Sequence, residues 1–466
     1  MNSRYDLAVI GAGSAGFSAA IAAAELGARV ALIGHGTIGG TCVNIGCVPS
    51  KNLIRATEAL YHANNAARFG GIRAQGSIED WRGVIRRKDE LVFSLRRAKY
   101  IDLLPNYDTV AYFEGQAGLT EGGLAVDGRP IEAGKIILAT GASPAVPPTP
   151  GIADVPYLTS TTALALDRLP RSLLVLGGGY TGCELGQMFA RAGVTVTIVD
   201  ILPILAAGEP EISRALAGYL REEGIAIWEN VETHALRTTS RGIVLDISAG
   251  GRGETLGAEQ LLVATGRRPN SEGMGLREAR VALLPNGGIR VDEHMRTTKP
   301  GVYAAGDVTG RDPFVYMAAY GAKLAAENAL TGDKKRYDAA AMPAIVFTDP
   351  HVATVGLTEA AARARGLKVK SSVLPLDQVP RALAARDTRG LIKLVADADS
   401  GKLLGAHILA PEGADSIQTA VLAIKCGLTV EQLAETIFPY LTTVEGLKLA
   451  AQAFDRDVAK LSCCAG

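Results

Sequence analysis

Residues 7–33 read LAVIGAGSAGFSAAIAAAELGARVALI, and this stretch decides the fold. An apolar run leads into a turn with glycines at positions 11, 13 and 16, an alanine-rich run follows, and a second apolar run begins at Val30. This order predicts a strand, a tight turn, a helix and a second strand. In such a unit Gly11 makes the turn, Gly13 lets a pyrophosphate approach the backbone, and Gly16 lets the helix pack on the strand. We therefore expect a dinucleotide here; a purely structural glycine turn is the alternative.

The same pattern returns at residues 173–199, which read LLVLGGGYTGCELGQMFARAGVTVTIV, with Gly177, Gly179 and Gly182 in the corresponding places. Each copy makes one phosphate cradle, so two copies imply two dinucleotides. Two such cofactors in one chain suggest electron transfer between a flavin and a nicotinamide. A duplicated copy that has lost its function is the alternative.

The two copies differ at the end of their second strand, where an acidic residue commonly binds the ribose hydroxyls. Gly34 stands there in the first copy and Asp200 in the second. A carboxylate repels a 2′-phosphate, and no Lys or Arg lies between Asp200 and Ser213, so the second copy favours NADH over NADPH. Gly34 leaves the first ribose without its usual carboxylate. His35 is a candidate substitute, unless it is simply an exposed loop histidine.

Composition limits the remaining function classes. The chain has 466 residues, 48% of them hydrophobic, which suits roughly two to four folded domains. Lys+Arg and Asp+Glu are equal at 48 each and aromatic residues make up 5%, so nucleic acid is not an expected partner. Only six cysteines and no signal-peptide pattern favour the cytoplasm. Residues 7–24 are uncharged, but their glycines fit a buried strand and helix better than a membrane span, so no membrane partner is expected.

A cysteine pair lies in GGTCVNIGCVPSK, residues 39–51. Cys42 and Cys47 are too widely spaced for the common CxxC zinc knuckle, and no second pair or histidine cluster is nearby, which leaves structural zinc as the weaker interpretation. A thiol near a helix N-terminus has a lowered pKa, and its thiolate attacks disulfides and binds soft metals. The sequence therefore predicts a redox-active pair. Cys183 and Cys426 lie in apolar helical surroundings and are expected to be buried.

A second cysteine pair ends the chain in LSCCAG. Adjacent α-carbons lie about 3.8 Å apart, below the roughly 4.4–6.8 Å of a relaxed disulfide. A bond between Cys463 and Cys464 would therefore be strained and easily reduced. The pair is either a dithiol presented on a free end or an unselected tail.

Several motifs together resemble the pyridine nucleotide disulfide oxidoreductases. They are GGTCVNIGCVPSK, the two glycine turns, ATG at residues 139–141 and 264–266, and YAAGD at 303–307. Within this family, the ending SCCAG and the stretch FPYLTTVEGLKLAAQ at 438–452 are most similar to the mercuric reductases. Glutathione reductases and dihydrolipoamide dehydrogenases carry a histidine directly before the proline of this stretch. This chain has Phe438 before Pro439.

The resemblance implies an α/β fold with two Rossmann-like dinucleotide-binding domains and a C-terminal α+β dimerisation domain. We expect an FAD-binding domain at residues 1–148 and 270–338 and an NAD(P)H-binding domain at 149–269. The dimerisation domain is expected at 339–466, with a flexible Cys-Cys tail. Prolines between 144 and 150 mark the first crossing and RRPN at 267–270 marks the second. The implied assembly is a homodimer whose active sites are shared between subunits.

The implied activity is the reduction of Hg(II) to Hg(0), which detoxifies mercury. NAD(P)H reduces FAD, the flavin opens the Cys42–Cys47 disulfide, Cys47 lies against the flavin, and Cys42 is the exchange thiol. Thiol-bound Hg(II) is collected by Cys463 and Cys464 of the partner subunit and passed to Cys42 and Cys47, so all four cysteines are metal ligands. Two alternatives stay open: a disulfide reductase of the dihydrolipoamide or glutathione type, and a protein that binds soft metals without reducing them.

The resemblance also assigns supporting residues. Tyr180 gates the nicotinamide pocket, or is a packed core tyrosine. Lys51 and Glu184 form an ion pair near the reactive flavin nitrogen, or an ordinary solvent-exposed pair. Tyr440 of the partner subunit steers the ion between thiol pairs, or is a plain interface tyrosine.

The cofactor contacts follow from the same match. Those expected for FAD are Gly11, Gly13, Ser14, Ala15, Gly16, Gly36, Gly40, Thr41, Lys51, Ala117, Thr140, Gly141, Asp307 and Val315. Those expected for NAD(P)H are Gly177, Gly179, Tyr180, Gly182, Asp200 and Gly266. The resemblance suggests NADPH, whereas Asp200 suggests NADH.

Overall fold

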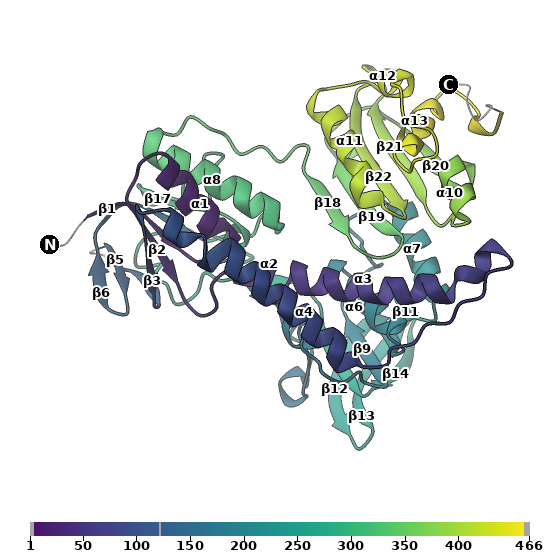
Figure 1. The fold of residues 1–466 in the computed structure, drawn as a ribbon, viewed down its shortest axis with the longest axis horizontal. Helices are drawn as coiled ribbons and strands as arrows, with labels where there is room; N and C mark the ends of the chain where they lie inside the picture. The colour runs from purple at the N-terminus through teal and green to yellow at the C-terminus, as the bar shows by residue number, and fades with distance from the viewer. Residues whose placement is uncertain (1–3, 121–122, 461–466) are drawn as a thin grey trace.

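The computed structural model describes residues 4–120 and 123–460. Each main sheet with the helices packed on it forms one body, and the bodies are arranged around long helices. The N-terminal sheet lies at the left of Figure 1, a second sheet at the lower right and a C-terminal sheet at the upper right. The predicted α/β class, with two Rossmann-like sheets and a C-terminal α+β part, is confirmed. Cys463 and Cys464 lie outside the described residues.

The first sheet is parallel, with the strand order β17-β7-β1-β2-β3. Its strands are β1 (Tyr5–Ile10), β2 (Val30–Gly34), β3 (Val110–Glu114), β7 (Ala133–Leu138) and β17 (Val302–Ala304). One face packs on α1 (Ser14–Glu25) and α8 (Val315–Thr331). The other packs on the antiparallel strands β4 (Ala117–Thr120), β5 (Gly123–Val126) and β6 (Arg129–Ile131). Both faces are covered, which is why β1 and β2 read as continuous apolar runs.

The second sheet repeats this arrangement, with the parallel order β11-β10-β9-β15. Its strands are β9 (Ser172–Leu176), β10 (Thr195–Val199), β11 (Ala226–Trp228) and β15 (Gln260–Val263). One face packs on α6 (Tyr180–Arg191) and α7 (Pro210–Glu222), near the short α5 (Ser160–Ala163). The other packs on the antiparallel β12 (Glu232–Thr239), β13 (Gly242–Ala249) and β14 (Arg252–Ala258).

The chain crosses between these two sheets twice, and the two crossings pair with each other. β8 (Ala142–Pro144) runs antiparallel to β16 (Arg267–Pro269). Asn270 ties the same crossings together, because its side-chain amide donates to Thr140 O at 2.9 Å and its Oδ1 accepts from Ser143 at 2.8 Å. Both crossings fall beside the predicted boundaries, and the exact domain limits stay predictions.

The C-terminal sheet is antiparallel, with the order β18-β19-β22-β21-β20. Its strands are β18 (Pro343–Val346), β19 (His351–Gly356), β20 (Val369–Pro375), β21 (Leu391–Asp397) and β22 (Leu403–Ala410). Its helices are α9 (Glu359–Ala364), α10 (Pro380–Ala385), α11 (Gly413–Lys425), α12 (Val430–Glu435) and α13 (Glu445–Gln452). Cys426 follows the last turn of α11 and is exposed, so its predicted burial was wrong, whereas Cys183 is buried as predicted.

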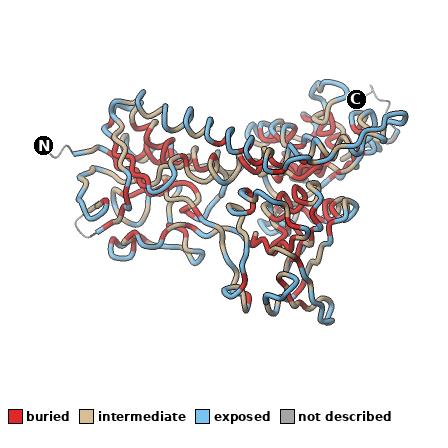
Figure 2. Tube along the Cα trace, turned by 60° about the horizontal axis from the view of Figure 1, so that its bottom comes forward, coloured by how far each residue is buried: buried red, intermediate tan, exposed pale blue. Residues whose placement is uncertain are grey.

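Three helices connect the bodies: α2 (Gly40–Ile45), α3 (Cys47–Asn64) and α4 (Trp81–Arg96). In Figure 1, α3 runs from the first sheet toward the gap between the other two. Figure 2 shows buried residues gathered inside the bodies, with exposed residues along the outer turns. Within the described residues, no helix combines the length and apolar character that crossing a membrane requires.

Candidate active site

A cavity of about 740 Å³ extends from the first glycine turn to the start of α6. Both cysteines of residues 39–51, Cys42 and Cys47, line it. It also contains most predicted flavin contacts: Gly11, Gly13, Ser14, Ala15, Gly36, Gly40, Thr41, Lys51, Ala117, Thr140, Gly141, Asp307 and Val315. Tyr180 lines it as well, whereas Gly16, Gly177, Gly179, Gly182, Asp200 and Gly266 do not. The structure thus brings the predicted flavin contacts and the thiol pair together.

Each glycine turn is shaped by close backbone packing. A Cβ on Gly16 would lie 1.6 Å from the carbonyl oxygen of Gly11, and one on Gly182 would lie 1.9 Å from that of Gly177. Only glycine therefore lets each helix start this close to its strand. At Gly179 no described heavy atom lies within 4 Å of the corresponding point, which leaves open space at the N-terminus of α6.

The cavity also presents a carboxylate that suits a flavin. Asp307 is half-buried, and within the described chain its own backbone N–H donates to its carboxylate but no other side chain does. Burial raises the pKa of Asp307, and the charge of Arg267 partly opposes this. Hydroxyl donors on a bound ligand would satisfy this carboxylate. The residues present therefore fit FAD.

The two cavity thiols are unequal. Both are free and half-buried, Cys42 within α2 and Cys47 at the start of α3. A hydrogen bond donated by Cys42 lowers the pKa of Cys47 to about 7 against the effect of burial, and the charge of Lys51 adds to the lowering. The same hydrogen bond, together with burial, raises the pKa of Cys42 well above its usual range. The pair therefore loses its first proton near neutral pH, and Cys47 holds the resulting thiolate.

Lys51 lies one turn after Cys47 on α3 and joins three parts of the chain. Its Nζ lies 2.6 Å from Glu184 Oε2, and Glu184 Oε1 accepts a hydrogen bond from the backbone N–H of Phe347 at 2.9 Å. The Lys51 ammonium also lies 4.8 Å from the centre of the Phe347 ring. The two charged side chains are only 32% and 8% exposed, so this is not an ordinary solvent-exposed pair.

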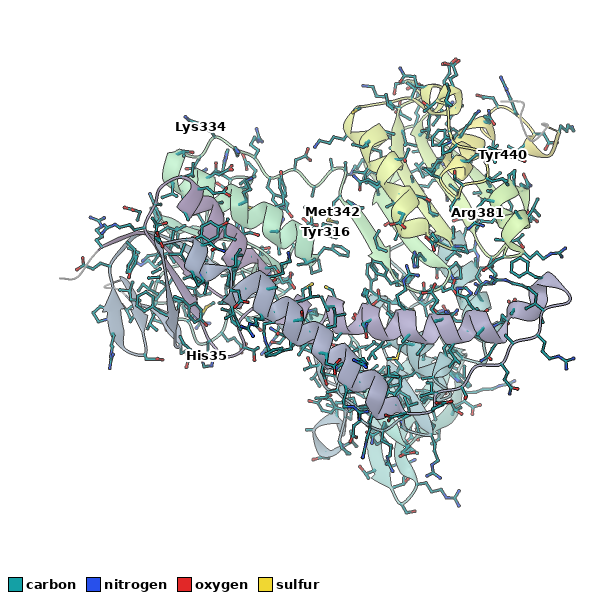
Figure 3. The ribbon with its side chains drawn as sticks, in the orientation of Figure 1. His35, Tyr316, Lys334, Met342, Arg381 and Tyr440 are labelled. Atoms are coloured by element: carbon teal, nitrogen blue, oxygen red, sulfur yellow. The ribbon has the colours of Figure 1, made fainter. Side chains whose placement is uncertain are left out.

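Aromatic side chains line the cavity at the start of α6. Tyr180 begins α6, is 40% exposed, and lies 6.0 Å from Phe314 between ring centres, so it is not a packed core tyrosine. Phe314 stacks on Tyr316, whose hydroxyl donates to the carbonyl of Pro343. Figure 3 shows Tyr316 beside Met342, between the first body and the C-terminal body.

Sequence reasoning missed three other groups at this cavity: Phe314 with Tyr316, Phe347 and Arg267. The Arg267 guanidinium donates to the carbonyl of Ala142, and burial lowers its pKa, opposed by the charges of Asp307 and Cys47. The one available signal was the position of Arg267 directly after the second ATG turn. A buried cation there suits anionic groups of a bound cofactor.

Asp200 lies at the second glycine turn. Its Oδ2 accepts from Gly178 N at 2.6 Å and its Oδ1 accepts from Leu202 N at 2.9 Å. These bonds fix the carboxylate at the end of β10. Beside it, Ile201 and Leu202 are exposed at 62% and 54%. The site therefore offers the Asp200 carboxylate and an apolar rim.

Tyr440, predicted to act in catalysis, does not line the cavity of its own chain. It is 47% exposed in the segment between α12 and α13, and Figure 3 shows it on the C-terminal body, apart from Tyr316. The neighbouring N–H of Leu441 donates to Glu445 Oε2 at 3.1 Å. Phe438, in the same segment, packs against the C-terminal core.

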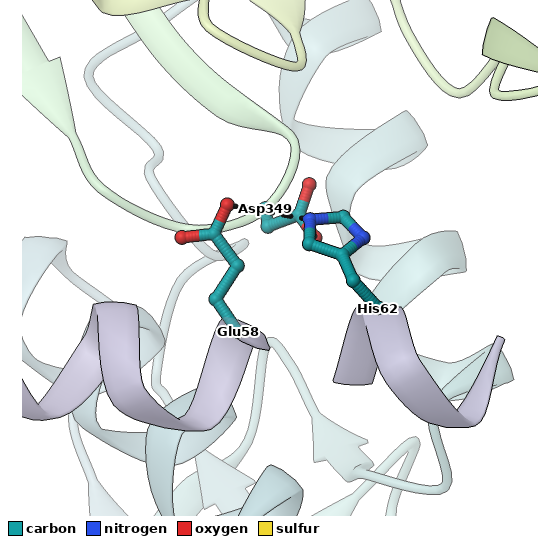
Figure 4. A group of neighbouring side chains, drawn as sticks. All are labelled: Glu58, His62 and Asp349. Atoms are coloured by element: carbon teal, nitrogen blue, oxygen red, sulfur yellow. Dashed lines mark ion pairs between the residues drawn. The ribbon is translucent and has the colours of Figure 1, made fainter. Parts of the chain in front are cut away.

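Glu58, His62 and Asp349 form the one three-residue group among the described residues with the spacing of a metal site (Figure 4). Both carboxylates of this group already form ion pairs with arginine guanidinium groups. Asp349 pairs with Arg191 at 2.9 Å and with Arg389 at 3.2 Å. A metal ion would face these cations at close range. We therefore interpret the group as an ion-pair network that joins α3 and α6 to the C-terminal body.

Comparison with known proteins agrees with this geometry. The family model described as pyridine nucleotide-disulphide oxidoreductase matches residues 5–326, and the model of that family's dimerisation domain matches residues 342–451. The chain belongs to this family. It is thus an NAD(P)H-dependent oxidoreductase with a dimerisation domain, as the sequence predicted.

Individual relatives show which members of the family the chain resembles. A mercuric reductase of Streptomyces lividans is 46% identical, covering 99% of this chain and 98% of its own. One of Staphylococcus aureus is 45% identical, covering 99% of this chain and 84% of its own. Among solved structures, the HOCl-induced flavoprotein disulfide reductase RclA of Escherichia coli is 31% identical, with a TM-score of 0.84, covering 96% of this chain and 99% of that chain. The predicted resemblance to the mercuric reductases is confirmed.

Proposed function

We propose that this protein reduces Hg(II) to Hg(0) with electrons from NAD(P)H, through FAD and the Cys42–Cys47 pair. The observation that carries the proposal is the unequal thiol pair beside Lys51 in a cavity that connects both glycine-turn bodies. When bound, FAD accepts a hydride from the nicotinamide and passes two electrons on. The chain itself supplies the thiolates, the positive charge and the enclosure.

The thiol pair suits a soft cation. Hg(II) prefers two sulfur ligands. Cys47 offers a thiolate near pH 7, and Cys42 gives up its proton when the metal binds, because metal binding and deprotonation are linked. Two electrons then convert Hg(II) to Hg(0), which leaves because the neutral atom has little affinity for thiolates.

The competing disulfide-reductase function needs an acid and base for a thiol leaving group. Phe438 stands where those relatives carry histidine, and its ring packs against the C-terminal core. A phenyl ring moves no proton, which favours the metal substrate.

The test is to mix the purified protein with Hg(II), excess thiol, and NADH or NADPH. Mercury-dependent oxidation of either nucleotide, with release of volatile mercury, supports the proposal. If neither nucleotide is oxidised, the proposal is wrong. Oxidised lipoamide and glutathione disulfide serve as competing substrates, and turnover at comparable rates would favour the disulfide reductases. Flavin absorbance near stoichiometry excludes a protein that only sequesters metal.

We expect NADH to be the better nucleotide, with kcat/KM exceeding that for NADPH by on the order of tenfold. The reason is repulsion between a 2′-phosphate and the fixed Asp200 carboxylate. Asp200→Asn removes the charge and keeps an acceptor for Gly178 N, so the preference should shrink. Steady-state kinetics with both nucleotides measure this. A preference for NADPH that Asp200→Asn leaves unchanged would contradict the assignment.

We further propose a cytoplasmic homodimer in which Cys463 and Cys464 of the partner subunit deliver Hg(II). Changing both to Ala should lower kcat/KM for Hg(II) carried on bulky thiols by on the order of tenfold, because a tethered dithiol acts at high effective concentration. Reduction of the Cys42–Cys47 disulfide by NAD(P)H should stay unchanged. Equal mercury turnover in both proteins would show that the tail does not deliver the ion.

A further inference from the structure

We propose that the hydroxyl of Tyr112 binds the adenosine ribose of FAD, in place of the carboxylate that Gly34 cannot supply. The inference rests on FAD binding at the first glycine turn. Gly34 ends β2, is buried, and lines the cavity directly after Ile33. It occupies the position where related folds place the acid that binds the ribose hydroxyls.

Position 34 has no room for a side chain, because Tyr112 fills it. A Cβ on Gly34 would lie 2.5 Å from the Tyr112 hydroxyl oxygen and 2.8 Å from Ala12 Cβ. Both distances are below any real contact of a Cβ atom. The glycine is therefore required by Tyr112 and Ala12 together, and the tyrosine hydroxyl lies 2.5 Å from the point where a side chain would begin.

The register of the sheet explains how a residue so distant in sequence reaches this point. β2 and β3 are parallel neighbours, with Leu32 opposite Tyr112. Side chains alternate along a strand, so Leu32 and residue 34 face the same side of the sheet as Tyr112. Leu32 belongs to the core under α1, and the Tyr112 ring packs against that core. The ring is thus anchored below and its hydroxyl points toward the end of β2.

The Tyr112 hydroxyl is also available for a ligand. Within the described residues it has no hydrogen-bond partner. Tyr112 does not itself line the cavity, but its hydroxyl lies next to Gly34, which does. Burial and the nearby charge of Glu114 raise the pKa of Tyr112, so the group stays a neutral hydroxyl. A neutral hydroxyl both donates and accepts, which matches a ribose diol.

Two other polar residues lie close to this position. His35 follows Gly34, is exposed and lines the cavity; Figure 3 labels it on the first body. Glu114 pairs with Gly34 across the ladder and is exposed. Neither fills the space above Gly34, whereas two of the three nearest atoms to that point belong to Tyr112. We therefore assign the contact to Tyr112.

The test measures FAD binding, not turnover. Protein stripped of flavin is titrated with FAD, and the dissociation constant is read from flavin fluorescence. Tyr112→Phe keeps the ring and removes the hydroxyl, so it should weaken FAD binding about 3- to 10-fold, the effect of one net hydrogen bond. The matched variants His35→Gln and Glu114→Gln should stay within about twofold of the parent. The melting temperature of the flavin-free protein should not change in Tyr112→Phe.

A rescue variant strengthens the test. Gly34→Glu combined with Tyr112→Ala and Ala12→Gly removes both close contacts at position 34 and restores the usual carboxylate, so FAD should bind at least as tightly as in Tyr112→Phe. Unchanged FAD binding in Tyr112→Phe would overturn the proposal, as would a larger loss in His35→Gln or Glu114→Gln. A protein that binds FAD through Tyr112 but reduces no mercury would refute the proposed function and leave this contact supported.

Discussion

Replacing either cavity cysteine with serine is expected to lower mercury-dependent oxidation of NAD(P)H by on the order of 10³-fold or more, as loss of an essential nucleophile does. Cys42 and Cys47 are the two thiols that line the cavity in the described part of the chain. A serine hydroxyl is a hard ligand that stays protonated near neutral pH, so neither variant can hold Hg(II) between two thiolates. The measurement is steady-state turnover, with flavin content determined in parallel.

Cys426→Ser is the matched control for these variants. Cys426 is exposed at the end of α11 and lies outside the cavity, so this substitution should leave turnover and flavin content unchanged. Turnover near the parent level in Cys42→Ser or Cys47→Ser would refute the role of the pair. Loss of flavin along with activity would indicate a disturbed fold, which the absorbance spectrum reveals directly.

A pH titration of the reduced protein tests the assignment of the thiolate. The pKa of Cys47 is lowered to about 7, so its thiolate exists above that pH and takes up a proton as the pH falls through it. Alkylation of the reduced pair should therefore rise through about pH 7. In Cys42→Ala the hydrogen bond to Cys47 is lost, so the midpoint should move to higher pH. An unshifted midpoint would show that the Cys42 thiol does not stabilise the Cys47 thiolate.

The sequence was informative where function depends on local geometry. Each glycine turn is set within a single strand–turn–helix segment, as predicted. Cys42 and Cys47 lie on two consecutive helices joined at Gly46, and Cys47 begins its helix. The prediction that Cys426 is buried was wrong for a local reason. It stands one residue beyond a helix whose apolar side faces the core, so hydrophobic neighbours do not imply that Cys426 itself is covered.

Contacts between distant segments could not be predicted in the same way. Phe347 reaches Glu184 only because the C-terminal body lies against α6. Tyr112 reaches Gly34 only because β2 and β3 pair in this register. Along the chain, 75 residues lie between Gly34 at the end of β2 and Val110 at the start of β3. No periodicity specifies such pairings; they depend on how whole sheets and helices pack.

Lys51→Met is expected to slow reduction of the bound flavin by NAD(P)H by on the order of 10²-fold, the usual effect of removing one preorganised electrostatic contact. The Lys51 ammonium is held by Glu184 at 2.6 Å and lines the cavity beside Cys47. The positive charge of Lys51 favours anionic states of the flavin and of Cys47. Its loss in Lys51→Met should therefore also raise the pKa of Cys47. Rapid mixing that follows loss of flavin absorbance gives the rate, and alkylation against pH gives the pKa.

Two further variants separate charge from packing at this site. Lys51→Arg keeps the cation and should retain most of the rate. Lys51→Met leaves the 8%-exposed carboxylate of Glu184 unpaired, which destabilises the fold by itself. Adding Glu184→Gln removes that charge while keeping an acceptor for Phe347 N, so the double variant should recover stability but not the rate. If the double variant reduces flavin as fast as the parent, Lys51 acts only through folding, and its electrostatic role is wrong.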